Sequence, residues 1–137
     1  MASASAPLAP SASSGAPEAR CYVAPYKGVD IIVINLSYTT PEEAIPIMRD
    51  AGELIGSYPA HSARVLTDAR GAVYSKESFN ALKALTIHNT PHIKASAVIG
   101  ADGLRVFAMK AVAVVTQRPI KPFQTREQAL DWLVSAD

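Results

Sequence analysis

The chain has 137 residues, with 13 Lys and Arg against 12 Asp and Glu, so its formal net charge is close to zero. The balanced charge, with no cluster of basic residues, argues against nucleic-acid binding, and the single cysteine excludes an internal disulfide bond. The longest apolar runs are too short for a transmembrane segment, and the N-terminus lacks the features of a secretory signal. We therefore expect a cytoplasmic protein with one domain.

The composition changes sharply near residue 20. Residues 1–19 are mostly Ala, Ser and Pro, which bury too little apolar surface to offset the entropy of ordering, so they predict a disordered tail. Residues 20–137 carry the periodic patterns of secondary structure and predict a single α/β domain.

The domain begins with a pattern typical of a hairpin. Residues 21–23 predict a strand, residues 25–28 a turn, and residues 30–37 a second strand that is rich in β-branched side chains. The second strand is apolar almost without interruption, which indicates burial on both faces of a sheet.

The first helix has a clear start in the sequence. Thr40 and Glu43 can form a capping box, with Pro41 in the first turn where its missing donor does no harm. We expect the helix to end near Gly56, and Pro46 to kink it or delay its regular start.

The later elements alternate between strand and helix, so the strands need crossovers and should be largely parallel. In chain order they are a strand over 63–67, a helix capped by Ser75 and stopped at 89–91, a strand over 93–99, a helix over 104–115, an edge strand over 120–123, and a final helix capped by Thr125 and Gln128. The predicted fold is a five-stranded mixed, mostly parallel sheet with about four helices.

Four segments together resemble the SpoIIAA-like branch of the STAS superfamily. They are Val65-Leu-Thr-Asp68, Asn89-Thr-Pro91, Ala97-Val-Ile-Gly100 and Phe123-Gln-Thr-Arg-Glu-Gln-Ala-Leu-Asp-Trp-Leu133. The resemblance covers roughly residues 26–134. It implies a bacterial-type STAS-like α/β domain that is usually non-enzymatic and acts through protein partners or self-association.

The best-known STAS proteins are regulated by phosphorylation of an Asp-Ser-Ser-Gly or Asp-Ser-Thr-Gly motif. The corresponding stretch here is Ser75-Lys-Glu-Ser78-Phe79, in which Ser78 falls near the phosphorylated position but the acid and the glycine are missing. The departure favours a simple capping role for these serines, with phosphorylation as the alternative.

Ligands of parallel α/β sheets gather at the carboxyl ends of the strands. The candidate ligand-binding or regulatory rim comprises Ser37, Tyr38, Asp68, Arg70, Ser75, Ser78, Gly100 and Gly103. The alternative is that Asp68 and Asp102 only fix turns by accepting backbone hydrogen bonds.

No group of residues predicts catalysis or metal binding. His88 and His92 are four residues apart, but Pro91 lies between them and should end the helix, and no third ligand is nearby. Cys21 has no evident activating partner and is expected to be a packed side chain. We therefore predict neither an enzyme nor a bound metal or cofactor.

The predicted helix over 104–115 is apolar nearly all round, which is typical of a helix covered on more than one side. Its outer face gives a candidate interface for self-association, which comprises Arg105, Val106, Met109, Lys110 and Ala113. The alternative is a small exposed patch without a role.

These observations favour a non-enzymatic interaction or regulatory module that forms a homo-oligomer or binds an unknown partner protein. The alternative is a small-molecule or lipid-binding protein that uses the rim or an apolar pocket.

Overall fold

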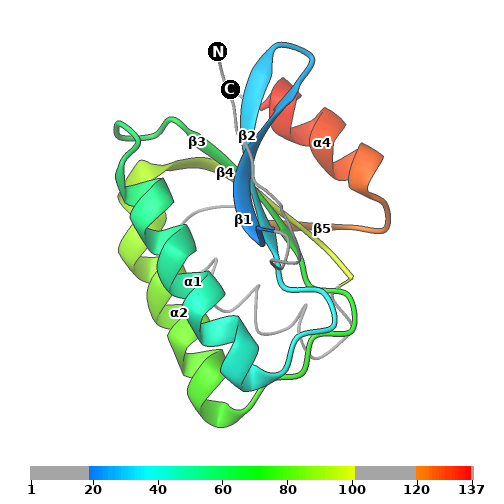
Figure 1. The fold of residues 1–137 in the computed structure, drawn as a ribbon. Helices are drawn as coiled ribbons and strands as arrows, with labels where there is room; N and C mark the ends of the chain where they lie inside the picture. The colour runs from blue at the N-terminus through cyan, green and yellow to red at the C-terminus, as the bar shows by residue number, and fades with distance from the viewer. Residues whose placement is uncertain (1–18, 101–119, 137) are drawn as a thin grey trace.

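The computed structural model describes residues 19–100 and 120–136. Within these ranges the chain forms one five-stranded sheet and three α-helices (Figure 1). The elements are β1 (Cys21–Tyr26), β2 (Val29–Asn35), α1 (Pro41–Gly56), β3 (Ala63–Asp68), α2 (Lys76–Asn89), a short 3₁₀ turn (Thr90–His92), β4 (Ile93–Ile99), β5 (Ile120–Phe123) and α4 (Arg126–Ser135). The helix predicted over 104–115 lies outside the described residues.

The sheet has the predicted mixed, mostly parallel topology. The strands follow the order β1-β2-β3-β4-β5, with β1 antiparallel to β2 and the other pairs parallel. The register places Asn35 beside Asp68, Asp68 beside Ile99, and Ile99 beside Phe123. The carboxyl ends of four strands therefore meet at one edge of the sheet.

The hairpin is longer than the sequence predicted. Strand β1 continues past Val23 to Tyr26, and the turn is confined to Lys27 and Gly28, which have φ angles of 51° and 80°. Positive φ at both central residues matches the tight turns whose twist fits a hairpin. Pro25 is tolerated inside β1 because this strand lies at the edge of the sheet.

The two faces of the sheet are covered by different helices. Helices α1 and α2 lie on one face and α4 on the other (Figure 1). Strand β2 serves both cores, because Ile32 and Ile34 pack toward α1 whereas Ile31 and Val33 pack toward α4. This confirms the predicted burial of β2 on both faces.

The predicted helix caps are confirmed. All three helices begin with a capping box, formed by Thr40 with Glu43, Ser75 with Ser78, and Thr125 with Gln128. Pro46, in contrast, does not delay α1, which runs without a break from Pro41 to Gly56. Pro46 is exposed, so the carbonyl group that it leaves unpaired can be hydrated.

Candidate functional site

The loops after β2 and β3 bring four of the predicted rim residues together. The backbone N–H of Leu36 donates to the carbonyl of Asp68, and that of Tyr38 donates to the carbonyl of Arg70, both at 2.8 Å. These bonds extend the parallel pairing beyond the strand ends. Ser37, Tyr38, Asp68 and Arg70 therefore form one continuous rim.

Asp68 and Arg70 neutralise each other. The Arg70 Nε and Nη2 atoms donate to the two Asp68 carboxylate oxygens at 3.0 and 2.7 Å, and the Arg70 backbone N–H adds a third bond at 3.1 Å. Asp68 is only 4% exposed, whereas the Arg70 side chain is 56% exposed. The bond to Asp68 raises the pKa of Arg70. Asp68 and Arg70, which the sequence placed at this rim, therefore form a fixed ion pair. Only the Arg70 side chain of this pair faces the solvent.

Tyr38 is the most exposed large hydrophobic residue of the described chain, at 74%. Its φ angle of 57° lies in the left-handed region, which is unusual for a bulky side chain. Its ring lies directly over Gly71, where a Cβ atom would overlap the ring carbons. The rim therefore presents an aromatic ring that packs on Gly71, in the same loop pair as Arg70.

Gly100 has a packing role at this rim. Its φ angle is 81°, and a Cβ atom there would lie 2.6 Å from the backbone N and Cα atoms of Arg70. Only glycine permits this close approach. Gly103, the other glycine predicted for the rim, lies outside the described residues.

Two residues that organise the rim were missed by the sequence interpretation. The backbone N–H and the hydroxyl of Ser37 donate to Asn35 Oδ1 at 3.0 and 2.6 Å. Arg20 donates from Nη1 to the carbonyl of Ser37 at 2.9 Å. Asn two residues before Ser at the end of a strand is a turn signal that could have identified the first bond, whereas no local signal identifies Arg20.

The other titratable candidates do not form a reactive or metal-binding group in the described residues. The Nδ1 atom of His92 lies 2.8 Å from the carbonyl oxygen of Tyr58, while His88 is exposed. Burial, with Asp50 nearby, raises the pKa of the Cys21 thiol to about 11, so the thiol stays protonated near neutral pH. Within residues 19–100 and 120–136, no three His, Cys, Asp or Glu side chains are grouped as metal ligands would be.

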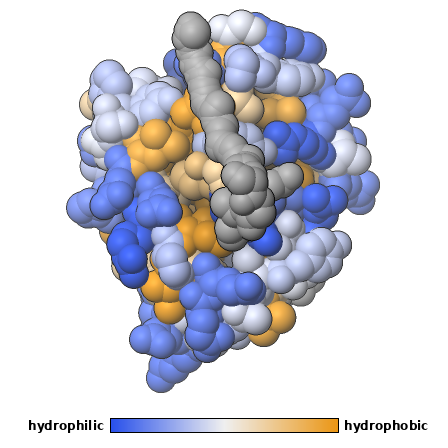
Figure 2. All heavy atoms as spheres, viewed as in Figure 1, coloured by the Kyte–Doolittle hydropathy of each residue, from blue (hydrophilic) through white to orange (hydrophobic). Residues whose placement is uncertain are grey.

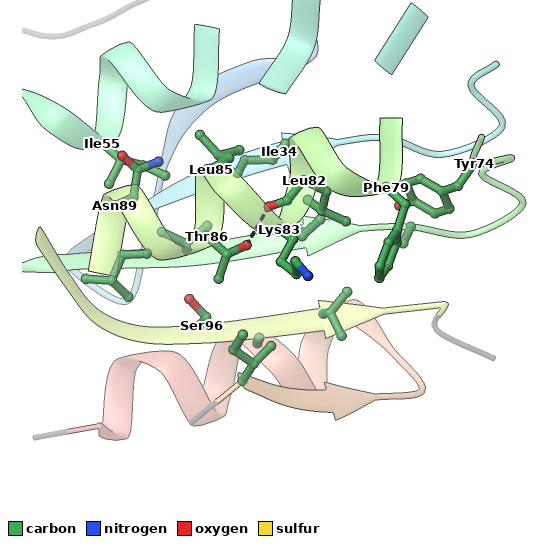
Figure 3. Close-up of a pocket in the computed structure, with 17 residues that line it drawn as sticks. Ile34, Ile55, Tyr74, Phe79, Leu82, Lys83, Leu85, Thr86, Asn89 and Ser96 are labelled. Carbon is green, nitrogen blue, oxygen red and sulfur yellow. Dashed lines mark hydrogen bonds between the residues drawn. The ribbon is translucent and has the colours of Figure 1, made fainter. Parts of the chain in front are cut away.

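A cavity of about 110 Å³ lies beneath α2, against strands β3 and β4 (Figure 3). Tyr74 and Phe79 lie at one end, and Asn89 lies at the other beside Ile55 of α1. The lining is mainly apolar and includes Ile34, Val65, Leu82, Leu85, Val98 and Ile120. The sequence interpretation allowed for an apolar pocket but did not place it here.

The backbone of α2 lies close to that of α1 and farther from the strands. Gly52 of α1 allows this close packing, since a Cβ atom there would lie 2.9 Å from Leu85 Cδ1. The cavity lies on the side of α2 that faces β3 and β4.

Asn89 is the least satisfied buried residue of the site. Its side chain is 1% exposed, and neither Oδ1 nor Nδ2 has a hydrogen-bond partner in the described part of the chain. An unpaired buried polar group costs about 1–3 kcal/mol. The sequence showed Asn89 only as part of a helix stop, because burial at a cavity wall has no local signature.

Comparison with known proteins identifies the fold. No family model and no curated protein matches the chain. A crystal structure of an uncharacterized protein from Shewanella loihica, of the DUF3478 family and with a SpoIIAA-like fold, matches with a TM-score of 0.62 and 20% sequence identity. The match covers 82% of this chain and 91% of the other. The fold is SpoIIAA-like.

In this SpoIIAA-like domain the two candidate phosphorylation sites differ in access. The Ser75 hydroxyl accepts from the backbone N–H of Ser78 at 3.0 Å, and the Ser78 hydroxyl accepts from that of Ser75 at 2.9 Å. Ser75 is exposed, whereas Ser78 is fully buried. Modification of Ser78 would therefore require the first turn of α2 to open, and it stays a prediction.

The remaining predicted surface cannot be placed on the SpoIIAA-like fold. The candidate interface residues Arg105, Val106, Met109, Lys110 and Ala113 lie outside the described residues. In the described ranges, none of the helices combines the length and the apolar character needed to cross a membrane.

Proposed function

We propose that this protein is a non-enzymatic interaction module whose rim binds a partner protein. The observation that carries the proposal is the exposed ring of Tyr38, which packs on Gly71, on the same rim as the Arg70 guanidinium that Asp68 holds. Tyrosine and arginine are among the residues that contribute most to binding at protein interfaces.

The surrounding structure constrains the backbone of Tyr38 and the side chain of Arg70 before a partner binds. The left-handed backbone of Tyr38 costs about 1–2 kcal/mol, which must be offset by the surrounding structure. Arg70 is held by two side-chain bonds to the buried carboxylate of Asp68. A group that is already fixed loses less conformational entropy on binding, so both features favour recognition.

The remaining hydrogen-bonding capacity of Arg70 indicates what the partner offers. A guanidinium has five N–H donors, and Asp68 uses the Nε donor and one donor on Nη2. The outward donors suit a backbone carbonyl or a carboxylate, while Tyr38 suits an apolar side chain. Asp68 neutralises the charge of Arg70, so long-range electrostatic attraction would contribute little to binding. The direction of the hydrogen bonds that Arg70 donates would instead select the partner.

The proposal is tested with a variant that removes the ring but keeps the backbone. Asn adopts the left-handed conformation more readily than Tyr, so Tyr38→Asn should fold at least as stably as the wild type. Immobilised full-length protein is used to capture partners from its own cells, followed by quantitative mass spectrometry. We expect Tyr38→Asn to lose a specific partner that the wild type retains.

The matched control is Val23→Thr, which changes an exposed apolar residue on the edge strand β1, away from the rim. It should retain the partner. Equal capture by Tyr38→Asn and by the wild type would show that the rim is not the binding surface.

Self-association through residues 104–115 is the second part of the proposal, and it rests on the sequence pattern. Val106→Glu or Met109→Glu should lower the mass measured by light scattering, because a charge buried in an apolar interface is unfavourable. Circular dichroism checks that the variants remain folded. An unchanged mass in folded variants would exclude this interface.

A further inference from the structure

We propose that the edge of strand β1 pairs with β1 of a second copy of this chain, in an antiparallel arrangement centred on Val23. The proposal is independent of the rim and of residues 104–115. It rests on the difference between the two edges of the sheet, on the direction of the backbone groups of β1, and on the exposure of Val23.

The two edges of the described sheet differ in how well they are protected against pairing. Strand β5 is four residues long and contains Lys121 and Pro122, so a short length, a charge and a missing donor all discourage another strand. Strand β1, at the opposite edge, has six residues and no charged side chain (Figure 1). Its proline, Pro25, lies near the end of the strand. Among the described strands, β1 is therefore the edge suited to pairing.

The hydrogen bonds to β2 show which backbone groups of β1 point away from the sheet. The backbone N–H of Asn35 donates to the carbonyl of Arg20 at 2.6 Å, so these two residues form a hydrogen-bonded pair. Hydrogen-bonded and non-hydrogen-bonded pairs alternate along an antiparallel ladder. The register therefore turns the backbone N–H and carbonyl groups of Cys21 and Val23, and the carbonyl of Pro25, outward.

Two identical β1 strands complement each other about a two-fold axis at Val23, the symmetry that most dimers of identical chains adopt. Val23 lies opposite Val23 of the second copy, and the two residues exchange N–H to carbonyl bonds. Cys21 lies opposite Pro25 of the second copy and donates to its carbonyl. The arrangement thus uses the outward N–H of both Cys21 and Val23, and it needs no donor from Pro25.

Other registers are less favourable. A shift toward the turn would place Val23 opposite Pro25, which has no N–H to donate in return. A shift in the other direction would extend the pairing beyond Cys21, where β1 begins. The sequence of β1 therefore specifies the register centred on Val23.

The side chains of β1 also suit a second copy. Like charges that lie opposite each other destabilise a pair of strands, but β1 contains no Asp, Glu, Lys or Arg. Val23 is 40% exposed and is one of the few large apolar side chains on the described surface. In the dimer it would be covered by its own counterpart.

The test measures the association of the full chain by sedimentation equilibrium, with substitutions at one position. We expect the wild type to form a dimer as its concentration rises. Val23→Pro removes the central donors without removing a bond to β2, so it should weaken dimerisation about tenfold or more. Val23→Lys keeps the backbone but places two positive charges opposite each other, and it should also dissociate the dimer. Val23→Thr keeps the donor and a β-branched side chain, so it should retain the dimer.

Two further measurements separate this interface from other surfaces. Ile87→Lys introduces the same charge at an exposed apolar residue of α2, and it should leave the mass unchanged. Amide hydrogen exchange at Val23 should slow as the concentration of the wild type rises, because pairing protects this N–H. Circular dichroism checks that each variant is folded.

A wild type that stays monomeric at every concentration would overturn the proposal, whether or not β1 binds a strand of another protein. A dimer that both Val23→Pro and Val23→Lys leave intact would also overturn it. Loss of the dimer in Val106→Glu, with no concentration dependence of exchange at Val23, would assign self-association to residues 104–115 instead. Capture of a partner by the rim is measured separately, so either proposal can fail without the other.

Discussion

The two faces of the sheet are packed in opposite ways. Among the described helices, α4 packs on one face, which we call the filled face, where Ala129, Leu130 and Leu133 meet small and branched side chains of β2, β3 and β4. Helices α1 and α2 pack on the other, the cavity face, which contains the cavity of about 110 Å³.

The difference lies in what each helix packs against. Ala95 and Ala97 of β4 are short, so α4 can lie close to the sheet. Helix α2 packs instead against α1 at Gly52, with the Asn89 amide on the α1 side and Lys83 and Thr86 pointing toward β4. In Figure 2, hydrophobic residues gather near the centre of this side of the molecule, and hydrophilic residues border them. The filled face is packed by α4, whereas the cavity face contains an apolar cavity.

The largest expected effect is on the filled face. Leu133 is fully buried, so Leu133→Ala should lower the free energy of unfolding by about 2–5 kcal/mol. Leu82 is only half-buried and already lines a cavity, so Leu82→Ala should cost less than half as much. Urea denaturation of both variants measures the difference. Equal losses would show that the two faces are packed alike.

A change of opposite sign is expected at the cavity. Asn89→Leu removes an amide that has no partner in the described ranges and replaces it with an apolar group of similar size. It should raise the free energy of unfolding by about 1–2 kcal/mol. Asn89→Asp is the informative companion, because a buried charge there should destabilise the protein strongly. A destabilised Asn89→Leu variant would mean that the amide is satisfied in solution.

The same contrast shows how far the sequence alone could go. Local patterns predicted the capping boxes at Thr40 and Thr125, the limits of β4 and β5, and the double burial of β2. They placed the rim residues at one edge, because parallel strands end together. Each of these features depends on neighbours in the chain or on a general rule of topology.

Other features depend on contacts that no local pattern records. The close approach of α2 to α1 depends on the contact between Gly52 and Leu85, and the cavity is lined by residues from β2, α1, β3, α2, β4 and β5, which are far apart in the sequence. Asp68 and Arg70 were separate candidate ligand groups in the sequence, but in the structure they bind each other in an ion pair. Strand β1 extends to Tyr26 because an edge position tolerates Pro25, which the sequence interpretation assigned to a turn.

The smallest expected effect concerns the polar contact that joins α4 to the β1–β2 hairpin. Asp131 of α4 accepts from the Tyr26 hydroxyl at 2.7 Å and from Lys27 Nζ at 3.0 Å, and these bonds to the hairpin lower the pKa of Asp131. When folding lowers the pKa of a carboxyl group, the ionised group stabilises the folded state at pH values above the pKa that the group has in the unfolded chain. This contribution is lost as the pH falls through the pKa that the group has in the folded protein. The same contact raises the pKa of Tyr26 and Lys27, so it is also lost at strongly alkaline pH.

Lys27 and Asp131 are exposed and Tyr26 is only partly buried, so the effect should be modest and should weaken with added salt. We expect the stability difference between the wild type and Asp131→Asn to be present at neutral pH, to decrease below about pH 4, and to disappear as the pH falls through the lowered pKa of Asp131. Urea denaturation of both proteins across this range measures it. A difference that stays constant with pH would mean that the contact between the hairpin and α4 does not depend on the charge of Asp131. Apolar packing alone would then hold α4 on the filled face. The two faces would in that case differ only in how closely their apolar side chains pack.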